Sequence, residues 1–143
     1  MKTWMTTITL TVLLVAGAAA RQDAVPKELA ALQGTWMIVS VNDQSAADQG
    51  VTLSVTFTGN KYAQSLNGQV VETGTVRPDA TKKPMTLDFT ILEGDDAGKL
   101  QLGIVEIAAD TAKFALAPPG STTRPTEFAS GGAANVLIAK KVK

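Results

Sequence analysis

Two carboxylates on neighbouring predicted strands are the residues of this chain whose types could do catalytic chemistry. Asp88 and Glu106 would suit glycoside hydrolysis, which needs a pair of acidic side chains at a defined separation. Asp88 alternates with the apolar residues Leu87 and Phe89, so its side chain is expected to face solvent. Glu106 can lie on either face of its strand, and an inward carboxylate there would need an internal partner. The pattern therefore argues against catalysis by this pair.

A second group of acids surrounds a glycine-rich turn. Glu93, Asp95 and Asp96 lie beside Gly94 and Gly98, and oxygen ligands in such a turn could bind Ca²⁺. Their spacing matches no EF-hand pattern. We expect a solvated hairpin turn and no metal site.

A third feature is an arginine in an unusually long connection. Arg124, Glu127 and Phe128 lie in the loop 118–134, longer than most connections in compact domains. In a structural interpretation, Phe128 anchors the loop in the mouth of a barrel, and Arg124 and Glu127 hold it by ion pairs or backbone hydrogen bonds. In a functional interpretation, Arg124 binds a carboxylate or phosphate on a ligand that enters the same mouth.

Composition excludes several function classes. The sequence has no Cys and no His, so the commonest zinc ligands, Ser-His-Asp and Cys-His arrangements and the usual near-neutral base are missing. We therefore expect a protein that is not an enzyme and needs no cofactor. Thirteen Lys and Arg balance 13 Asp and Glu, which gives no electrostatic reason to expect a nucleic acid as partner.

The N-terminus resembles an export signal. Lys2 precedes a mainly apolar run from Ile8 to Val15, and small residues follow at 18–20. This run is too short for a spanning helix. We expect a signal peptide at 1–20 and a single exported domain at 21–143 without a membrane span, which ends up in the periplasm, at the cell surface or outside the cell. Without disulfides, that domain must be held together by its core.

The elements that position these residues are predicted by local pattern. Pro26 followed by 27–32 favours two turns of helix, and Gly34 suits the positive φ that ends it. Alternating apolar residues predict strands, and Asn67-Gly68 predicts a tight hairpin. The expected strands are 35–41, 51–57, 61–65, 69–76, 85–91, 99–107, 111–117 and 135–141, with a polar loop at 77–84.

Eight short strands joined mostly by tight turns predict an all-β, antiparallel up-and-down barrel. The interior of such a barrel is either just filled by side chains or holds one small ligand. Phe57, Phe89 and Phe114 lie on apolar strand faces and either pack in the core or line a cavity. Trp36 is expected to plug the closed end.

Several segments stand out along the chain: Leu-Gln-Gly-Thr-Trp at 32–36, Ala-Pro-Pro-Gly at 117–120, Arg-Pro-Thr-Glu-Phe at 124–128 and the middle strands at 82–88 and 102–106. Together they resemble a family of small exported bacterial proteins described as lipocalin-like, whose biochemical role is uncharacterised. The resemblance covers about residues 30–141 and implies an eight-stranded lipocalin-like barrel.

Lipocalins pair this tryptophan with an arginine near the end of the last strand. In this sequence the corresponding residue is Lys140 or Lys141. A lysine can lie over a ring but lacks the planar stacking of a guanidinium group.

Two functions remain open. The preferred one is a non-enzymatic binding module for a small apolar or amphipathic molecule, with Phe57, Phe89, Phe114, Leu116 and Arg124 as the ligand-binding residues. The alternative is an envelope structural or interaction module with a filled core. A cavity of about 300 Å³ or more, open at one end, would favour the first.

Overall fold

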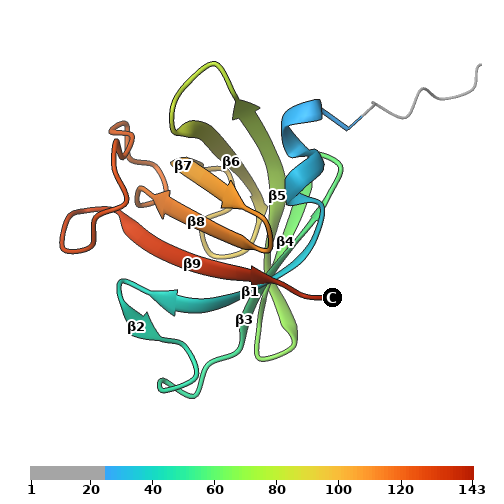
Figure 1. Ribbon diagram of the computed structural model, residues 1–143, viewed down its shortest axis with the longest axis vertical. Helices are drawn as coiled ribbons and strands as arrows, with labels where there is room; N and C mark the ends of the chain where they lie inside the picture. Colours follow the sequence, from blue (N-terminus) through green and yellow to red (C-terminus); the bar gives the residue numbers. More distant parts are fainter. Residues whose placement is uncertain (1–24) are drawn as a thin grey trace, which may run out of the picture.

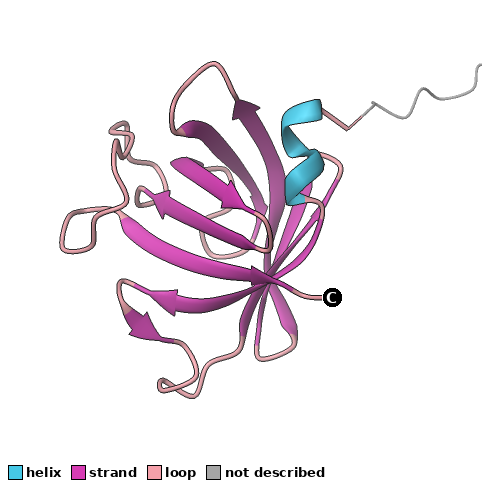
Figure 2. Ribbon diagram, in the orientation of Figure 1, coloured by secondary structure: helices cyan, strands magenta, loops and turns pink. Residues whose placement is uncertain are grey.

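The computed structural model describes residues 25–143, so the predicted signal peptide at 1–20 lies outside the described residues. A short 3-10 helix precedes nine strands (Figures 1 and 2). The elements are η1 (Lys27–Leu32), β1 (Gly34–Val41), β2 (Gln44–Ser45), β3 (Leu53–Thr58), β4 (Lys61–Leu66), β5 (Gln69–Asp79), β6 (Met85–Glu93), β7 (Leu100–Ala108), β8 (Thr111–Leu116) and β9 (Asn135–Lys141). In this part of the chain, no helix has the length and apolar character that crossing a membrane requires.

The sheet closes on itself. Strands β3 to β9 follow one another in chain order, each antiparallel to the next, and β1 pairs with both β3 and β9. Trp36 lies opposite Lys141 and Val41 opposite Leu137, so the first and last strands meet along most of their length (Figure 1). The prediction of a closed, eight-stranded antiparallel barrel is confirmed. The two residues of β2 are an addition that pairs only with the end of β1.

Strand alternation decides what fills the barrel. Side chains of successive residues point to opposite faces, so each strand sends every second residue inward. The resulting core contains Leu29, Leu32, Trp36, Ile38, Phe57, Tyr62, Val76, Leu87, Phe89, Val105, Ala112, Phe114 and Ala139. Without disulfides, burial of this apolar surface is the main force that holds the domain together.

One end of the barrel is sealed by η1 and Trp36. The indole is fully buried, and its Nε1 donates a hydrogen bond of 2.8 Å to the carbonyl oxygen of Leu32, the last residue of η1. Gln33 ties the same helix to the β3–β4 turn, since its side chain accepts from the Gly59 amide and donates to the Gly59 carbonyl. Gly34 has a φ of +102°, a conformation that glycine adopts without strain as the chain enters β1.

A second clamp joins β1 and β9 at the opposite end. Asn42 follows β1 directly, and its side-chain oxygen accepts a hydrogen bond of 2.8 Å from the backbone N–H of Val136. Its side-chain nitrogen donates to the Asn135 side chain at 2.9 Å. At this end of the barrel, the closing seam is therefore held by side-chain hydrogen bonds as well as by its backbone ladder.

Most strands begin or end one to three residues from the predicted positions, and two of these differences have a clear cause. The β3 strand begins at Leu53 rather than at residue 51, because the amide of Val51 bonds to Ala46 within the turn. The β5 strand continues to Asp79, through residues expected to be loop. The N–H of Val76 points toward β4 and donates to the Asn60 carbonyl oxygen. N–H groups two residues apart on a strand point to the same side, so an N–H at position 78 would also point toward β4. The pairing with β4 stops at Thr75, so Pro78, which has no N–H, loses no ladder hydrogen bond there.

Replacing Trp36 tests whether the seal stabilises the barrel. We expect Trp36→Ala to lower the free energy of unfolding by about 3–5 kcal/mol, because it leaves a large cavity and an unpaired Leu32 carbonyl. Trp36→Phe should cost less, since most of the ring volume stays. Urea denaturation followed by circular dichroism measures both, with the exposed Val142→Ala as control. An unchanged midpoint for Trp36→Ala would contradict this role.

Candidate functional site

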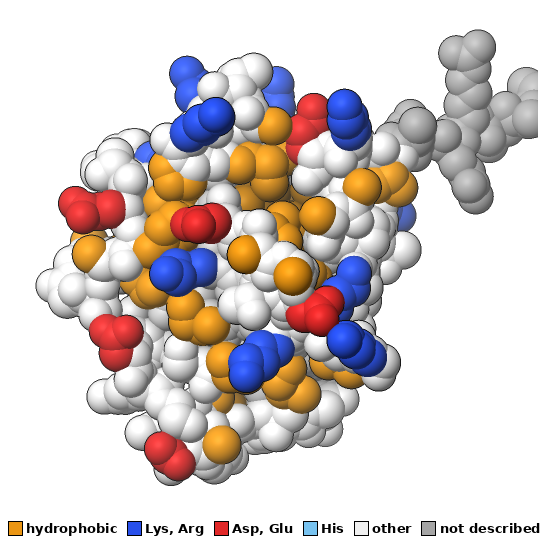
Figure 3. Space-filling view, viewed as in Figure 1, with side chains coloured by type: hydrophobic (Ala, Val, Ile, Leu, Met, Phe, Trp, Pro, Cys, Tyr) orange, Lys and Arg blue, Asp and Glu red, His pale blue; other side chains and the backbone are white. Residues whose placement is uncertain are grey.

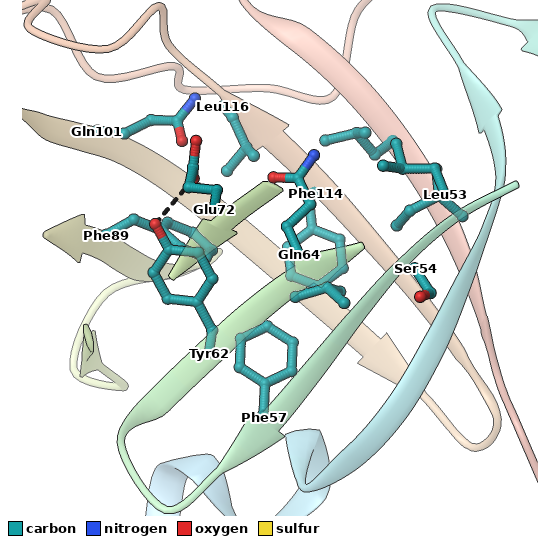
Figure 4. Close-up of a pocket in the computed structure, with 13 residues that line it drawn as sticks. Leu53, Ser54, Phe57, Tyr62, Gln64, Glu72, Phe89, Gln101, Phe114 and Leu116 are labelled. Carbon is teal, nitrogen blue, oxygen red and sulfur yellow. Dashed lines mark hydrogen bonds between the residues drawn. The ribbon is translucent and has the colours of Figure 1, made fainter. Parts of the chain in front are cut away.

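A cavity of about 70 Å³ lies inside the barrel. The residues next to η1 are almost fully buried, whereas Gln64, Glu72 and Gln101 are half-buried, so the cavity meets solvent on their side. Figure 4 shows these three side chains farther from the helix than Phe57. The lining residues are Ile38, Leu53, Ser54, Val55, Phe57, Tyr62, Gln64, Glu72, Phe89, Gln101, Phe114, Leu116 and Leu137.

Aromatic rings form the deep walls of the cavity. Phe57 and Phe114 stack with ring centroids 6.4 Å apart and an interplanar angle of 15°. Tyr62 meets Phe89 edge to face, at 5.0 Å and 85°. Four of the five predicted ligand-binding residues, the three phenylalanines and Leu116, line this cavity together.

Tyr62 and Glu72 bring a polar pair into the barrel. The phenol of Tyr62 donates a hydrogen bond of 2.8 Å to Oε1 of Glu72 (Figure 4). The tyrosine ring crosses Gly74, the residue opposite it on β5, where a Cβ atom would lie 2.8 Å from the ring and 2.0 Å from the Thr90 carbonyl oxygen. Only glycine fits there, so Gly74 fixes the position of the ring and its hydroxyl.

The environment of Tyr62 holds the phenol in its neutral form. Burial, the hydrogen bond to Glu72 and the negative charge of that carboxylate all raise the pKa of Tyr62, burial most strongly. The phenol is therefore a fixed donor that orients the carboxylate at any ordinary pH.

Two carboxamides complete the polar side of the cavity. Gln101 donates from Nε2 to the Ala117 carbonyl at 3.0 Å, which leaves its side-chain oxygen available. The Gln64 side chain makes no hydrogen bond to any other residue of 25–143. None of these four polar residues was predicted from the sequence as a site residue. The sequence did hold a signal for two of them. Gln64 lies two residues from Tyr62 and Glu72 lies four residues from Val76, and such spacings put both members of a pair on the same face of a strand.

Arg124 does not lie at this cavity, which corrects the predicted ligand clamp. Its Nη1 donates to Oδ1 of Asp88 at 2.5 Å and to the Gly103 carbonyl oxygen at 2.9 Å. Asp88 points outward from β6, between the inward residues Leu87 and Phe89, so the ion pair lies on the outer face of the barrel. The arginine fastens the long loop to this face instead of reaching a ligand.

Phe128 likewise packs outside the barrel, not in its mouth as predicted. Its ring covers Ile104, Ala115 and Val136, three outward residues that lie side by side on β7, β8 and β9. Lys113 places its Nζ 5.8 Å from the centroid of the ring. We call residues 118–134 the outer strap, because Arg124 and Phe128 hold it across the outer face.

Two other residues were predicted to have structural roles, the loop glutamate and a lysine near the tryptophan. Glu127 is exposed and, within residues 25–143, makes no ion pair. The lysine over the tryptophan is Lys141, whose Nζ lies 5.7 Å from the centroid of the Trp36 ring. Lys140, the other residue that the sequence offered, is exposed, because the neighbour of an inward residue on a strand must point outward.

The acidic residues form no paired or clustered site. Asp88 and Glu106 both lie on the outer face, and Glu106 is roughly 13 Å along β7 from the residue opposite Asp88. Glu93 accepts a hydrogen bond from Thr73, and Asp96 pairs with Lys99 at 2.9 Å. In the described part of the chain, no group of three or more acids is placed to hold a metal ion.

The face of the molecule in Figure 3 shows basic and acidic side chains interspersed with exposed apolar ones, without a block of one sign.

A scan against protein-family models and a search of curated proteins found no match for this chain.

Titration of the single tyrosine tests the Tyr62–Glu72 pair directly. An unfolded tyrosine ionises near pH 10, whereas the folded barrel should keep this proton well above that value. The stability contributed by the protonated phenol is then constant below about pH 10 and is lost as the pH rises above it. Ultraviolet absorbance should show phenolate only as the barrel unfolds. An ordinary titration near pH 10 in the folded protein would contradict the buried pair.

Substitution of the strap arginine tests its structural role. Arg124→Ala and Asp88→Asn should each lower stability, by about 1–2 kcal/mol for the arginine, which also loses the Gly103 carbonyl. The double variant should show a coupling of about 0.5–1 kcal/mol, since both side chains are partly exposed, at 30% and 25%. Lys99→Ala, at an exposed pair, should cost less. Additive effects in denaturant titrations would argue against the ion pair.

Proposed function

We propose that this protein is an exported, non-enzymatic, lipocalin-like domain that binds a small amphipathic molecule inside its barrel. The observation that supports the proposal is a cavity with apolar rings on its deep side and three polar side chains on its solvent side. A filled structural core has no need of half-buried Gln64, Glu72 and Gln101 around an empty space, because polar groups are costly to bury without partners.

The size of the cavity limits the ligand. About 70 Å³ does not reach the roughly 300 Å³ that would favour a binding module by size, so the proposal rests on the residues that line the cavity. The volume is about half the roughly 150 Å³ of a cavity that encloses benzene, so the cavity has room for about three non-hydrogen atoms. We therefore propose a ligand whose enclosed part has about that many non-hydrogen atoms, and whose remainder extends through the open side.

The alternative, an envelope interaction module, has one observation in its favour. Large aliphatic side chains are exposed beside the β4–β5 and β6–β7 turns, which in a meander lie at the same end of the barrel. These residues are Leu66, Val70, Val71, Leu92 and Leu100. They are placed to touch a partner protein without any use of the cavity.

Cavity filling separates the two functions. Native mass spectrometry of protein purified from its own source should show a bound small molecule. Leu53→Phe, which adds a ring at the cavity, should abolish its retention. Leu66→Phe is the matched control, because Leu66 is the cross-strand neighbour of Leu53 but is exposed and does not line the cavity. Absence of any co-purified molecule, with no thermal shift from a metabolite and lipid panel, would favour the interaction module.

A further inference from the structure

The cavity contains an acid but no base. Of the described residues that line it, Glu72 is the one with a formal charge, and no Lys or Arg is among them. The remaining walls are aromatic, aliphatic or uncharged polar. A half-buried carboxylate in such surroundings loses solvation and gains no protein cation in exchange.

Glu72 is held in place but is not saturated. The Tyr62 phenol donates to Oε1, and no other hydrogen bond to this carboxylate is made within residues 25–143. The second oxygen, Oε2, is thus an oriented acceptor. Raising the pKa of Tyr62 keeps that phenol a donor, so it cannot release its proton and turn into a competing anion.

The neighbouring carboxamides add acceptors on the same side. Gln101 uses its nitrogen on the Ala117 carbonyl and keeps its oxygen free. Gln64 lines the same cavity and can turn its oxygen toward it. A primary ammonium group has three donors and no acceptor, which matches one carboxylate oxygen and two amide oxygens. Tyr62 and Phe89 also line the cavity, and an aromatic ring attracts a cation that lies over its face.

We propose that the ligand is a compact hydrophobic primary amine, bound as its ammonium ion with the charge at Glu72 and the carbon skeleton against Phe57 and Phe114. This inference rests on the proposed binding function and narrows it to one ligand class. A carboxylate of the same skeleton would meet Glu72 as a like charge with no basic residue to offset it.

Three probes with one carbon skeleton test the charge preference. They are propylamine, 1-propanol and propanoate, whose short chains suit a space of about three non-hydrogen atoms that is open on its polar side. Binding is measured from amide chemical shifts of the ¹⁵N-labelled protein at constant pH and ionic strength. The amine should bind roughly tenfold or more tightly than the alcohol, since hydrogen bonds to charged groups are the stronger ones. The carboxylate should bind weakest.

A matched pair of variants assigns the preference to Glu72. Glu72→Gln keeps the shape and the acceptor for Tyr62 but removes the charge, so the amine should lose its advantage while the alcohol binds as before. Glu93→Gln is the control, because Glu93 also accepts from a hydroxyl, that of Thr73, but on the outer face. It should leave all three affinities unchanged.

The outcomes distinguish the two levels of the proposal. If none of the three probes shifts cavity residues, the binding function itself fails. If the alcohol or the carboxylate binds as tightly as the amine, or if Glu72→Gln leaves the amine advantage intact, the cavity binds ligands but the inference of an amine is wrong.

Discussion

The hydrogen-bonded seam between β1 and β9 is the constraint on which the rest of the structure depends. An open eight-stranded sheet would expose its apolar face, whereas closure turns that face into an interior. The seam is held by its backbone ladder and, at one end, by the hydrogen bond from Val136 to the Asn42 side chain. Trp36, bonded to the end of η1, closes the other end of the barrel, so the interior space is sealed on that side. The polar groups at its solvent side follow from the same closure, which brings β4, β5 and β7 around one axis.

The barrel uses its two faces differently. Inside, the rings of Phe57 and Phe114 leave a small space, and among the described residues that line it Glu72 is the one with a charge. Outside, an ion pair between Arg124 and Asp88 and the ring of Phe128 hold the outer strap against the sheet. The long loop thus contributes to the architecture, while the strand segments around the cavity supply the polar side chains at its solvent side.

The sequence predicted the fold well because strand alternation is a local signal. Eight strands, the burial of Trp36 and the grouping of the phenylalanines follow from period-two patterns. The directions of Arg124 and Phe128 could not be predicted, since a loop of that length reaches either face of a barrel and periodicity says nothing about loops. Pro78 was misleading for a different reason. A proline there loses no hydrogen bond, because β4 does not reach that part of β5. This depends on the register between the two strands, which the sequence of β5 alone does not reveal.

The outer strap covers an apolar patch but is not needed to hold the strands beneath it together. Beneath Phe128 lies a patch of Ile104, Ala115 and Val136 on three adjacent strands, which the backbone ladder of β7, β8 and β9 holds in place without help from the strap. A protease cut within 118–134 would leave that ladder intact but could free the aromatic cover. The nicked molecule would keep its barrel but expose an apolar patch. Damage to this loop would therefore lead to self-association before any loss of native structure.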